Sequence, residues 1–110
     1  KVPYWDFDAD LAEPLPWGPQ KESSAAAIAA SGLMDLAQQT KSPEWAIAYH
    51  NEGLVMLDVL STPEYLAVDT SGWEGILKHG VYHTRKNLGV DESVLWGDFF
   101  FIEALAKAVQ

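Results

Sequence analysis

Four polar side chains that can bind an anion lie within five residues of this sequence. They are His83, Arg85, Lys86 and Asn87. An apolar segment with helical spacing follows them, and Asp91 or Ser93 is a suitable N-cap for that helix. The first N–H groups of a helix have no partner within it, so a polar loop held there suits an anionic ligand. Residues 80–101 are therefore the segment in which we expect function to reside.

Each of these basic side chains also has a structural alternative. His83 suits a hydrogen bond to a hydroxyl or carboxylate of a ligand, and it equally suits a satisfied structural histidine. Arg85 and Lys86 are adjacent basic residues in an acidic chain, and they can contact a ligand or form a solvated surface pair. The sequence alone leaves both alternatives open.

The remaining patterns of ionisable residues favour structural roles. His79 and His83 are four residues apart, but Gly80 disfavours a helix there and no third zinc ligand is evident. Glu92 and Asp98 form a possible carboxylate pair for glycoside chemistry. However, both lie near a helix start, where acidic side chains are favoured by the helix dipole alone. We therefore expect no metal site and no cofactor in this chain, and structural roles for Glu92 and Asp98.

Composition restricts the class of protein. The chain has 110 residues, 48% of them hydrophobic and 21% charged, which describes one small globular domain. Its net charge of −9 disfavours a nucleic-acid partner, and without cysteine it has no disulfide framework. Five tryptophans are many for this length, and flat indole faces suit sugar rings as well as cores.

The chain offers no evident targeting or membrane segment. No apolar run approaches the roughly 18 residues of a membrane span. It begins with Lys1, not Met, and no signal peptide follows. We expect a processed chain or a piece of a longer one, with a cytoplasmic location and no membrane partner.

The periodicity predicts an all-α fold with three principal helices. Their expected ranges are residues 24–38, 43–60 and 93–109, after an irregular lead-in over residues 1–20 that contains four prolines. Ser23 or Ser24 should cap the first helix, and Ser42 followed by Pro43 should open the second. The short connection between these two helices predicts an antiparallel hairpin. A brief strand pairing is possible at Ile76–Leu77.

The third predicted helix carries an apolar stripe. Its members recur at helical spacing: Leu95, Phe99, Ile102 and Val109. Such a stripe indicates the helix face that packs into a core. Glu103 and Lys107 should form an i,i+4 pair on the solvent side.

Four stretches, in order, resemble the C-terminal part of an unsaturated glucuronyl hydrolase of glycoside hydrolase family 88. They read VPYWDFDA, ESSAAAIAASGL, HGVYH and GVDESVLWGDFF, at residues 2–9, 22–33, 79–83 and 89–100. The resemblance covers almost the whole chain. One departure is Glu22, where the family usually shows Asp before Ser-Ser.

The resemblance implies an (α/α)6 barrel, a ring of six helical hairpins, of which residues 1–110 supply about the last third. It also implies removal of 4,5-unsaturated glucuronic acid from the non-reducing end of oligosaccharides left by polysaccharide lyases. An aspartic acid protonates C4 and activates water for attack at C5, so the C4=C5 bond is hydrated and the glycosidic bond is lost. The catalytic aspartates of the family lie in earlier hairpins, outside the motifs matched here.

The resemblance assigns a substrate-binding role to the loop at residues 83–88. The expected contacts are His83, Arg85 and Lys86, with Trp5 as a further aromatic candidate. Members that prefer sulfated glycosaminoglycan fragments show Ser, Ser and Lys where this chain has His83, Lys86 and Leu88, which puts sulfate preference in doubt. The expected partners are an unsaturated uronic-acid oligosaccharide and the remaining hairpins, on the same polypeptide or another chain.

A second hypothesis remains open at this point: a non-catalytic helical module that binds sugars or a partner. Part of a ring cannot bury both of its open edges. We therefore expect exposed apolar helix faces under either hypothesis.

Overall fold

The computed structural model of the chain describes residues 2–6, 21–83, 86 and 88–109. Its elements follow the order α1 (Ser23–Gln39), α2 (Pro43–Leu60), β1 (Gly80–His83), β2 (Leu88–Glu92) and α3 (Leu95–Ala108). All three predicted helices are present, and the second has the bounds expected from its sequence. None of the helices in the described ranges is long and apolar enough to cross a membrane.

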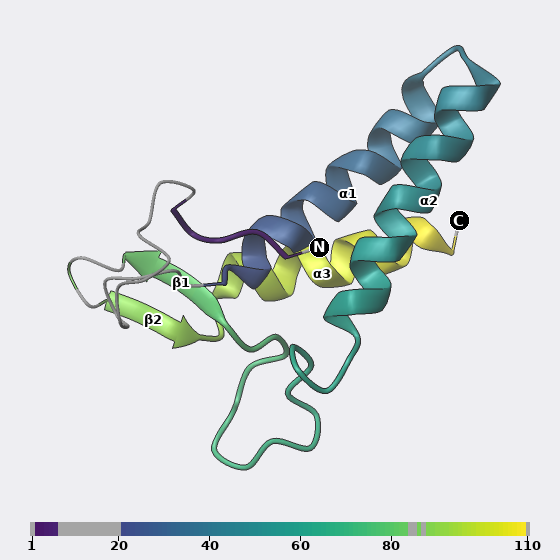
Figure 1. Cartoon of the computed structure of the whole chain (residues 1–110). Coiled ribbons are helices and arrows are strands. Elements are labelled where there is room, and N and C mark those ends of the chain that lie inside the picture. Colours follow the sequence, from purple (N-terminus) through teal and green to yellow (C-terminus); the bar gives the residue numbers. More distant parts are fainter. Residues whose placement is uncertain (1, 7–20, 84–85, 87, 110) are drawn as a thin grey trace.

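Helices α1 and α2 form the predicted antiparallel hairpin, which projects from the rest of the molecule (Figure 1). Ser42 caps α2 as expected, because its hydroxyl accepts a hydrogen bond from the Trp45 N–H at 3.3 Å. Helix α3 crosses the base of α1, and the β-hairpin lies near the N-terminal end of α1 (Figure 1). Helix α1 therefore contacts all of the other helices and β1.

The all-α prediction needs one correction, because residues 80–92 form a two-stranded antiparallel sheet. Val81 pairs with Val90 and His83 with Leu88, and a bulge lies between Gly80 and Val81. These strands are short, and Gly89 within β2 has a positive φ of 54° that interrupts any simple alternation. The expected brief pairing near Ile76–Leu77 is an isolated bridge between Leu66 and Leu77.

The core gathers around one face of α1. The alanine run of α1 supplies small side chains that allow close approach of α2 and α3. The central members of this core are Ala26, Ala27, Ala30, Met34, Leu57, Leu60, Phe101 and Ala104. At Gly97, an added Cβ would lie 2.9 Å from the Ser24 Cβ, so α3 meets α1 there with almost no space.

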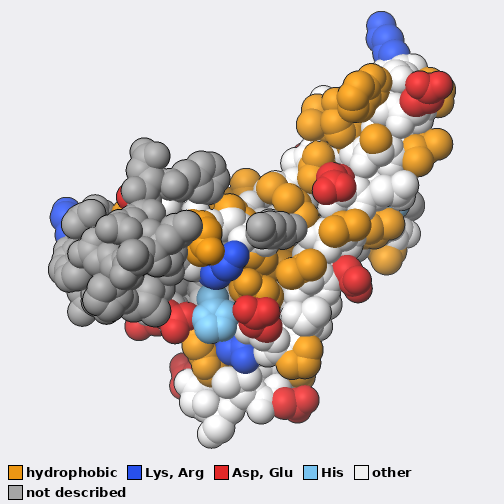
Figure 2. All heavy atoms as spheres, viewed as in Figure 1, with side chains coloured by type: hydrophobic (Ala, Val, Ile, Leu, Met, Phe, Trp, Pro, Cys, Tyr) orange, Lys and Arg blue, Asp and Glu red, His pale blue; other side chains and the backbone are white. Residues whose placement is uncertain are grey.

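The apolar stripe predicted to bury α3 is wrong for this chain. Leu95 is 84% exposed and Val109 is 86% exposed, while Phe99 and Ile102 are also exposed. The face of α3 that does pack on α1 carries Gly97, Phe101 and Ala104. The stripe is therefore apolar but uncovered, and the prediction failed because periodicity shows which face is apolar without showing what covers it. Figure 2 likewise shows hydrophobic side chains at the surface along the projecting α1–α2 hairpin.

Two helix caps also differ from prediction. Glu22, not Ser23 or Ser24, caps α1, because its longer side chain reaches the N–H groups of Ser24 and Ala25. Helix α3 starts after Val94 and has no side-chain cap, so neither Asp91 nor Ser93 caps it. The Ser93 hydroxyl instead donates to the Leu77 carbonyl.

Candidate functional site

The predicted ligand loop is the turn of the β-hairpin. Strand β2 lies between this turn and α3, so the turn does not lead directly into the first turn of the helix as expected. His83 ends β1, and Lys86 lies exposed in the turn. Arg85 lies outside the described residues, as does the side chain of His83. The backbone pairing of His83 with Leu88 closes the two strands on either side of the turn.

Trp5, the fourth predicted binding residue, lies in the short N-terminal segment and is half-buried. Its neighbour Tyr4 forms a bridge with Lys21, just before α1. The Lys21 ammonium group lies 4.3 Å from the centre of the Tyr4 ring, within range of a cation–π interaction. This short segment is therefore fixed against the start of α1.

A buried carboxylate joins the start of α1 to the β-hairpin. Glu22 is 7% exposed, and its Oε1 accepts hydrogen bonds from the Val81 N–H at 3.1 Å and the Ser24 N–H at 3.1 Å. Its Oε2 accepts one from the Ala25 N–H at 3.0 Å. The Ser24 hydroxyl donates to the same carboxylate at 2.6 Å. A buried carboxylate requires this density of donors, so the start of α1 and β1 are held in one position.

An aromatic pair that the sequence analysis missed lies beside this carboxylate. The rings of Tyr82 and Trp96 meet edge to face with centroids 5.8 Å apart, and both side chains are exposed, Tyr82 more than Trp96. The Trp96 indole N–H donates to the Ser24 hydroxyl at 3.1 Å. Tyr82 belongs to the turn-bearing hairpin, so an exposed aromatic surface adjoins the cationic turn. The only signal in the sequence was the position of both residues inside the quoted motifs.

The two members of the possible carboxylate pair have different surroundings. The two oxygens of Asp98 accept hydrogen bonds from the backbone N–H groups of Ile76 and Leu77, at 3.1 and 2.9 Å. Asp98 therefore fastens the connector before the hairpin to the first turn of α3, a structural role as expected. Glu92 instead lines an open hollow of about 400 Å³ beside the connector, together with Glu74 and Asp91.

His79 takes part in a second structural contact. Its Nδ1 pairs with the Asp91 carboxylate, and both residues adopt positive φ angles, 63° and 57°. The ring of Tyr65 meets the His79 ring edge on, at 5.7 Å between centroids. Within the described ranges, no group of three or more His, Cys, Asp or Glu side chains is placed to hold a metal ion. His83, the second histidine of the zinc-like spacing considered in the sequence, has a side chain outside the described residues.

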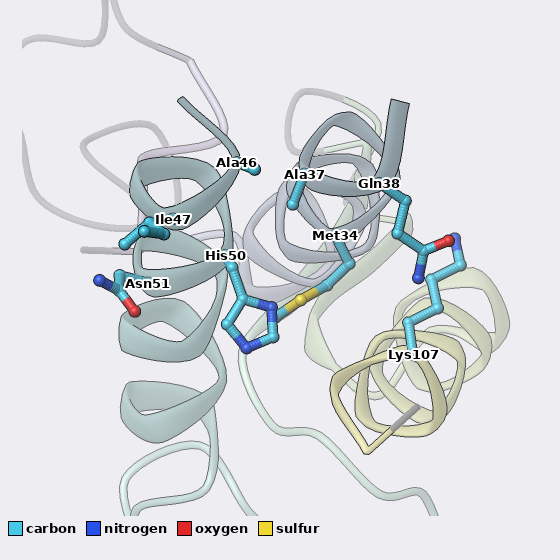
Figure 3. A pocket seen from close by; sticks show the side chains of 8 residues that line it. All are labelled: Met34, Ala37, Gln38, Ala46, Ile47, His50, Asn51 and Lys107. Atoms are coloured by element: carbon cyan, nitrogen blue, oxygen red, sulfur yellow. The ribbon is translucent and has the colours of Figure 1, made fainter. Parts of the chain in front are cut away.

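Two open hollows among the helices are lined by helix residues and not by the β-hairpin. One of about 360 Å³ is lined by residues of all three helices, and Figure 3 shows His50 and Met34 pointing toward one another there. Lys107 of α3 borders it from the other side (Figure 3). A second hollow, of about 460 Å³, lies between α2 and α3. Their lining is mainly apolar, and of the predicted binding residues whose side chains are described, neither Trp5 nor Lys86 contributes to either hollow.

A polar cluster closes the α1–α3 contact. The Lys107 ammonium group donates to Asp35 at 2.9 Å and to the Ser31 hydroxyl at 2.8 Å, and it lies 3.5 Å from Glu103. Burial lowers the pKa of Lys107, but hydrogen bonding and charge attraction from Asp35, with Glu103, outweigh it and raise the pKa above 10.5. The predicted i,i+4 pair is thus present, although Lys107 is mostly buried.

The chain is similar to curated unsaturated uronyl hydrolases along nearly all of its length. It is 34% identical over 106 residues to the unsaturated glucuronyl hydrolase of Formosa agariphila, and 30% identical over 106 residues to that of Bacillus sp. (strain GL1). It is 31% identical over 113 residues to the unsaturated chondroitin disaccharide hydrolase of Streptococcus pyogenes serotype M1. These alignments cover 96–97% of this chain but 24–27% of each relative. No family model matches the chain.

Solved structures agree. A heparin-specific unsaturated glucuronyl hydrolase superposes with a TM-score of 0.83 at 33% identity, over 99% of this chain and 28% of that one. The Bacillus sp. GL1 enzyme, described as responsible for glycosaminoglycan degradation, gives a TM-score of 0.78 at 31% identity, over 96% of this chain and 27% of its own. The chain thus spans about a quarter of these relatives. In sequence and in structure it is similar to unsaturated glucuronyl hydrolases over almost its whole length, consistent with the C-terminal part of a glycoside hydrolase family 88 protein, as its motifs predicted.

Proposed function

We propose that this chain is the C-terminal segment of an (α/α)6 barrel that removes 4,5-unsaturated glucuronic acid from lyase-generated oligosaccharides. The observation that carries the proposal is the similarity over 99% of the chain to a heparin-specific unsaturated glucuronyl hydrolase, at a TM-score of 0.83. A substituted unsaturated glucuronyl hydrolase solved with the tetrasaccharide dGlcA-Glc-Rha-Glc is also similar, at 31% identity and a TM-score of 0.78.

The uncovered helix faces support an incomplete barrel. Ile47 on α2 and Leu95 on α3 are largely exposed, along with many other large apolar side chains in the described part of the chain. Apolar surface in this quantity marks a contact with further protein. In the proposal, the other hairpins of the barrel cover these faces and fill the hollows between the helices.

The proposed role of this chain is substrate binding, not catalysis. The hydration of C4=C5 requires an aspartic acid from hairpins outside this chain. The hairpin turn with His83, Arg85 and Lys86, the exposed Tyr82–Trp96 pair and Trp5 would form one wall of the cleft. Basic side chains would attract the uronate carboxylate, and aromatic rings would stack on the neighbouring sugar. A cytoplasmic location remains a prediction.

A chimera tests this proposal. In the Formosa agariphila enzyme, the aligned quarter is replaced by this chain, and hydration is followed by the loss of absorbance of the C4=C5 bond on an unsaturated glucuronyl disaccharide. We expect the chimera to be active and the isolated 110-residue chain to be inactive, because the proton donor lies elsewhere. The matched control is a truncated relative that lacks the quarter, which should also be inactive.

The non-catalytic alternative predicts different results. An isolated chain that binds the disaccharide, together with a folded but inactive chimera, would favour a sugar-binding module. Hydrolysis by the isolated chain would show instead that a proton donor lies within these residues.

A further inference from the structure

The Glu22 carboxylate does more than cap α1. A cap requires bonds to the N–H groups at the start of the helix, and Glu22 makes these to Ser24 and Ala25. Its additional bond to the Val81 N–H spans 59 residues of sequence and lies in buried surroundings. Val81 immediately precedes Tyr82, so this bond fixes the strand position from which the Tyr82 ring projects.

Ser24 extends the same connection to α3. Its hydroxyl has one proton, which it donates to Glu22, and its oxygen accepts the indole N–H of Trp96. One carboxylate thus holds Tyr82 through the backbone of β1, and it holds Trp96 through a serine hydroxyl. The two rings that it holds are the pair that meet edge to face.

We propose that Glu22 and Ser24 are positioning residues that set the orientation of the Tyr82–Trp96 aromatic pair next to the hairpin turn. That this pair faces a sugar rests on the proposed function. The positioning itself is a property of this chain, and it can be measured without any sugar.

The chain offers a matched pair of serines for the test. Ser24 and Ser31 both lie on α1, both are buried, and both link α1 to α3 by side-chain hydrogen bonds. Ser31 bonds Glu103 and Lys107, away from the hairpin. Ser24→Ala therefore removes the link to Trp96, whereas Ser31→Ala removes a comparable link with no connection to the aromatic pair.

The measurement is nuclear magnetic resonance on the ¹⁵N-labelled 110-residue chain. The Trp96 indole N–H signal is assigned by its disappearance in Trp96→Phe, and the Tyr82–Trp96 nuclear Overhauser contacts are recorded in each variant. In Ser24→Ala, we expect the Trp96 indole signal to move upfield and the contacts to Tyr82 to weaken. In Ser31→Ala, both should match the original chain. Glu22→Gln should move the Val81 amide and the Trp96 indole together, because an amide N–H₂ replaces one acceptor oxygen.

An unchanged Trp96 indole signal in Ser24→Ala, or equal changes in the two serine variants, would overturn the proposal and leave Glu22 as a helix cap. Should Ser24→Ala fail to fold, Ser24→Cys keeps a side chain of the same shape, slightly larger, while weakening the acceptor, and it is read in the same way. The chimera decides separately whether the pair contacts sugar. An inactive chimera with a displaced Trp96 signal would contradict the proposed function alone.

Discussion

Helix α1 has two interfaces with apolar packing, and one of them adds directed polar bonds. Toward α2 it presents Met34 and alanines to Leu57 and Gly53, so the contact is apolar. Toward α3 and the β-hairpin it uses directed bonds from Ser24, Ser31 and the Glu22 carboxylate. Apolar packing allows small shifts, whereas hydrogen bonds fix distances within a few tenths of an ångström. The proposed substrate-binding hairpin is attached through the second kind of interface, where its position is set most closely.

Helices α2 and α3 both leave apolar side chains uncovered, and the first prediction concerns that surface. Leu95 on α3 is 84% exposed, so Leu95→Ser should change the unfolding free energy of the isolated chain by less than ~0.5 kcal/mol. In the chimera, where we propose that a neighbouring hairpin covers it, the same change should cost about 2 kcal/mol. Thermal unfolding of both proteins measures the difference.

Val68→Ser is the control for this prediction. Val68 is 79% exposed but lies on the connector, outside the apolar helix faces. It should be nearly neutral in both proteins. If Leu95→Ser is also neutral in the chimera, α3 remains uncovered there, and the barrel arrangement proposed for this face is wrong.

Glycine-to-alanine substitutions at the two interfaces measure how well each accommodates an added methyl group. At Gly97, between α3 and α1, a Cβ would meet the Ser24 Cβ at 2.9 Å, an atom fixed to the backbone. At Gly53, between α2 and α1, it would meet the Cε of Met34 at 2.8 Å, the end of a flexible side chain. Gly97→Ala should therefore cost about 1–3 kcal/mol of unfolding free energy, and Gly53→Ala less than ~1 kcal/mol.

Gly32→Ala completes that set, because a Cβ on Gly32 meets no atom within 4 Å. It should stabilise the chain by about 0.5–1 kcal/mol through helix propensity. Urea unfolding of the three variants gives the order. Equal losses at Gly97 and Gly53 would contradict the distinction between a directed and an adaptable interface.

The next prediction concerns the two basic residues of the β-hairpin turn, which we propose to bind substrate. Arg85→Ala with Lys86→Ala should raise the KM of the chimera several-fold and leave kcat nearly unchanged, since a partly exposed charge contact is worth about 1 kcal/mol. The effect should shrink as salt is added, because ions screen it. Lys41→Ala, which removes one positive charge at the far end of the α1–α2 hairpin, is the control for a charge lost away from the turn. A double variant with an unaltered KM at low salt would identify the turn as a solvated surface.

Prediction from sequence succeeded where signals were local. The Ser42–Pro43 start and the alanine run define α1 and α2 almost to the residue, because caps and propensity act within one turn. It failed where partners are distant along the chain. The bond from Val81 to Glu22 spans 59 positions, and the sheet depends on a bulge that no short pattern specifies. The Tyr82–Trp96 pair was missed for the same reason.

The smallest predicted effect is the pH dependence of the polar interface. The pKa of Lys107 is raised in the folded chain, chiefly because bonds to Asp35 outweigh the effect of burial. A raised folded pKa means that the folded state holds this proton more tightly. The stabilisation is therefore fully present below pH 10.5 and is lost as the pH rises through the folded pKa.

Lys107→Met isolates this contribution, because it keeps the length of the apolar stem and removes the charge. Its partners Asp35 and Glu103 are partly exposed, so the loss at neutral pH should be only about 0.5 kcal/mol. Above pH 10.5 the stability gap between the variant and the original chain should begin to shrink, and it should close as the pH passes the raised folded pKa of Lys107, as measured by urea unfolding across the pH range. A constant gap at every pH would mean that Lys107 acts through the packing of its stem. The charge would then contribute nothing to the α1–α3 interface, and the bonds from Ser24 and Ser31 would be its main polar contacts.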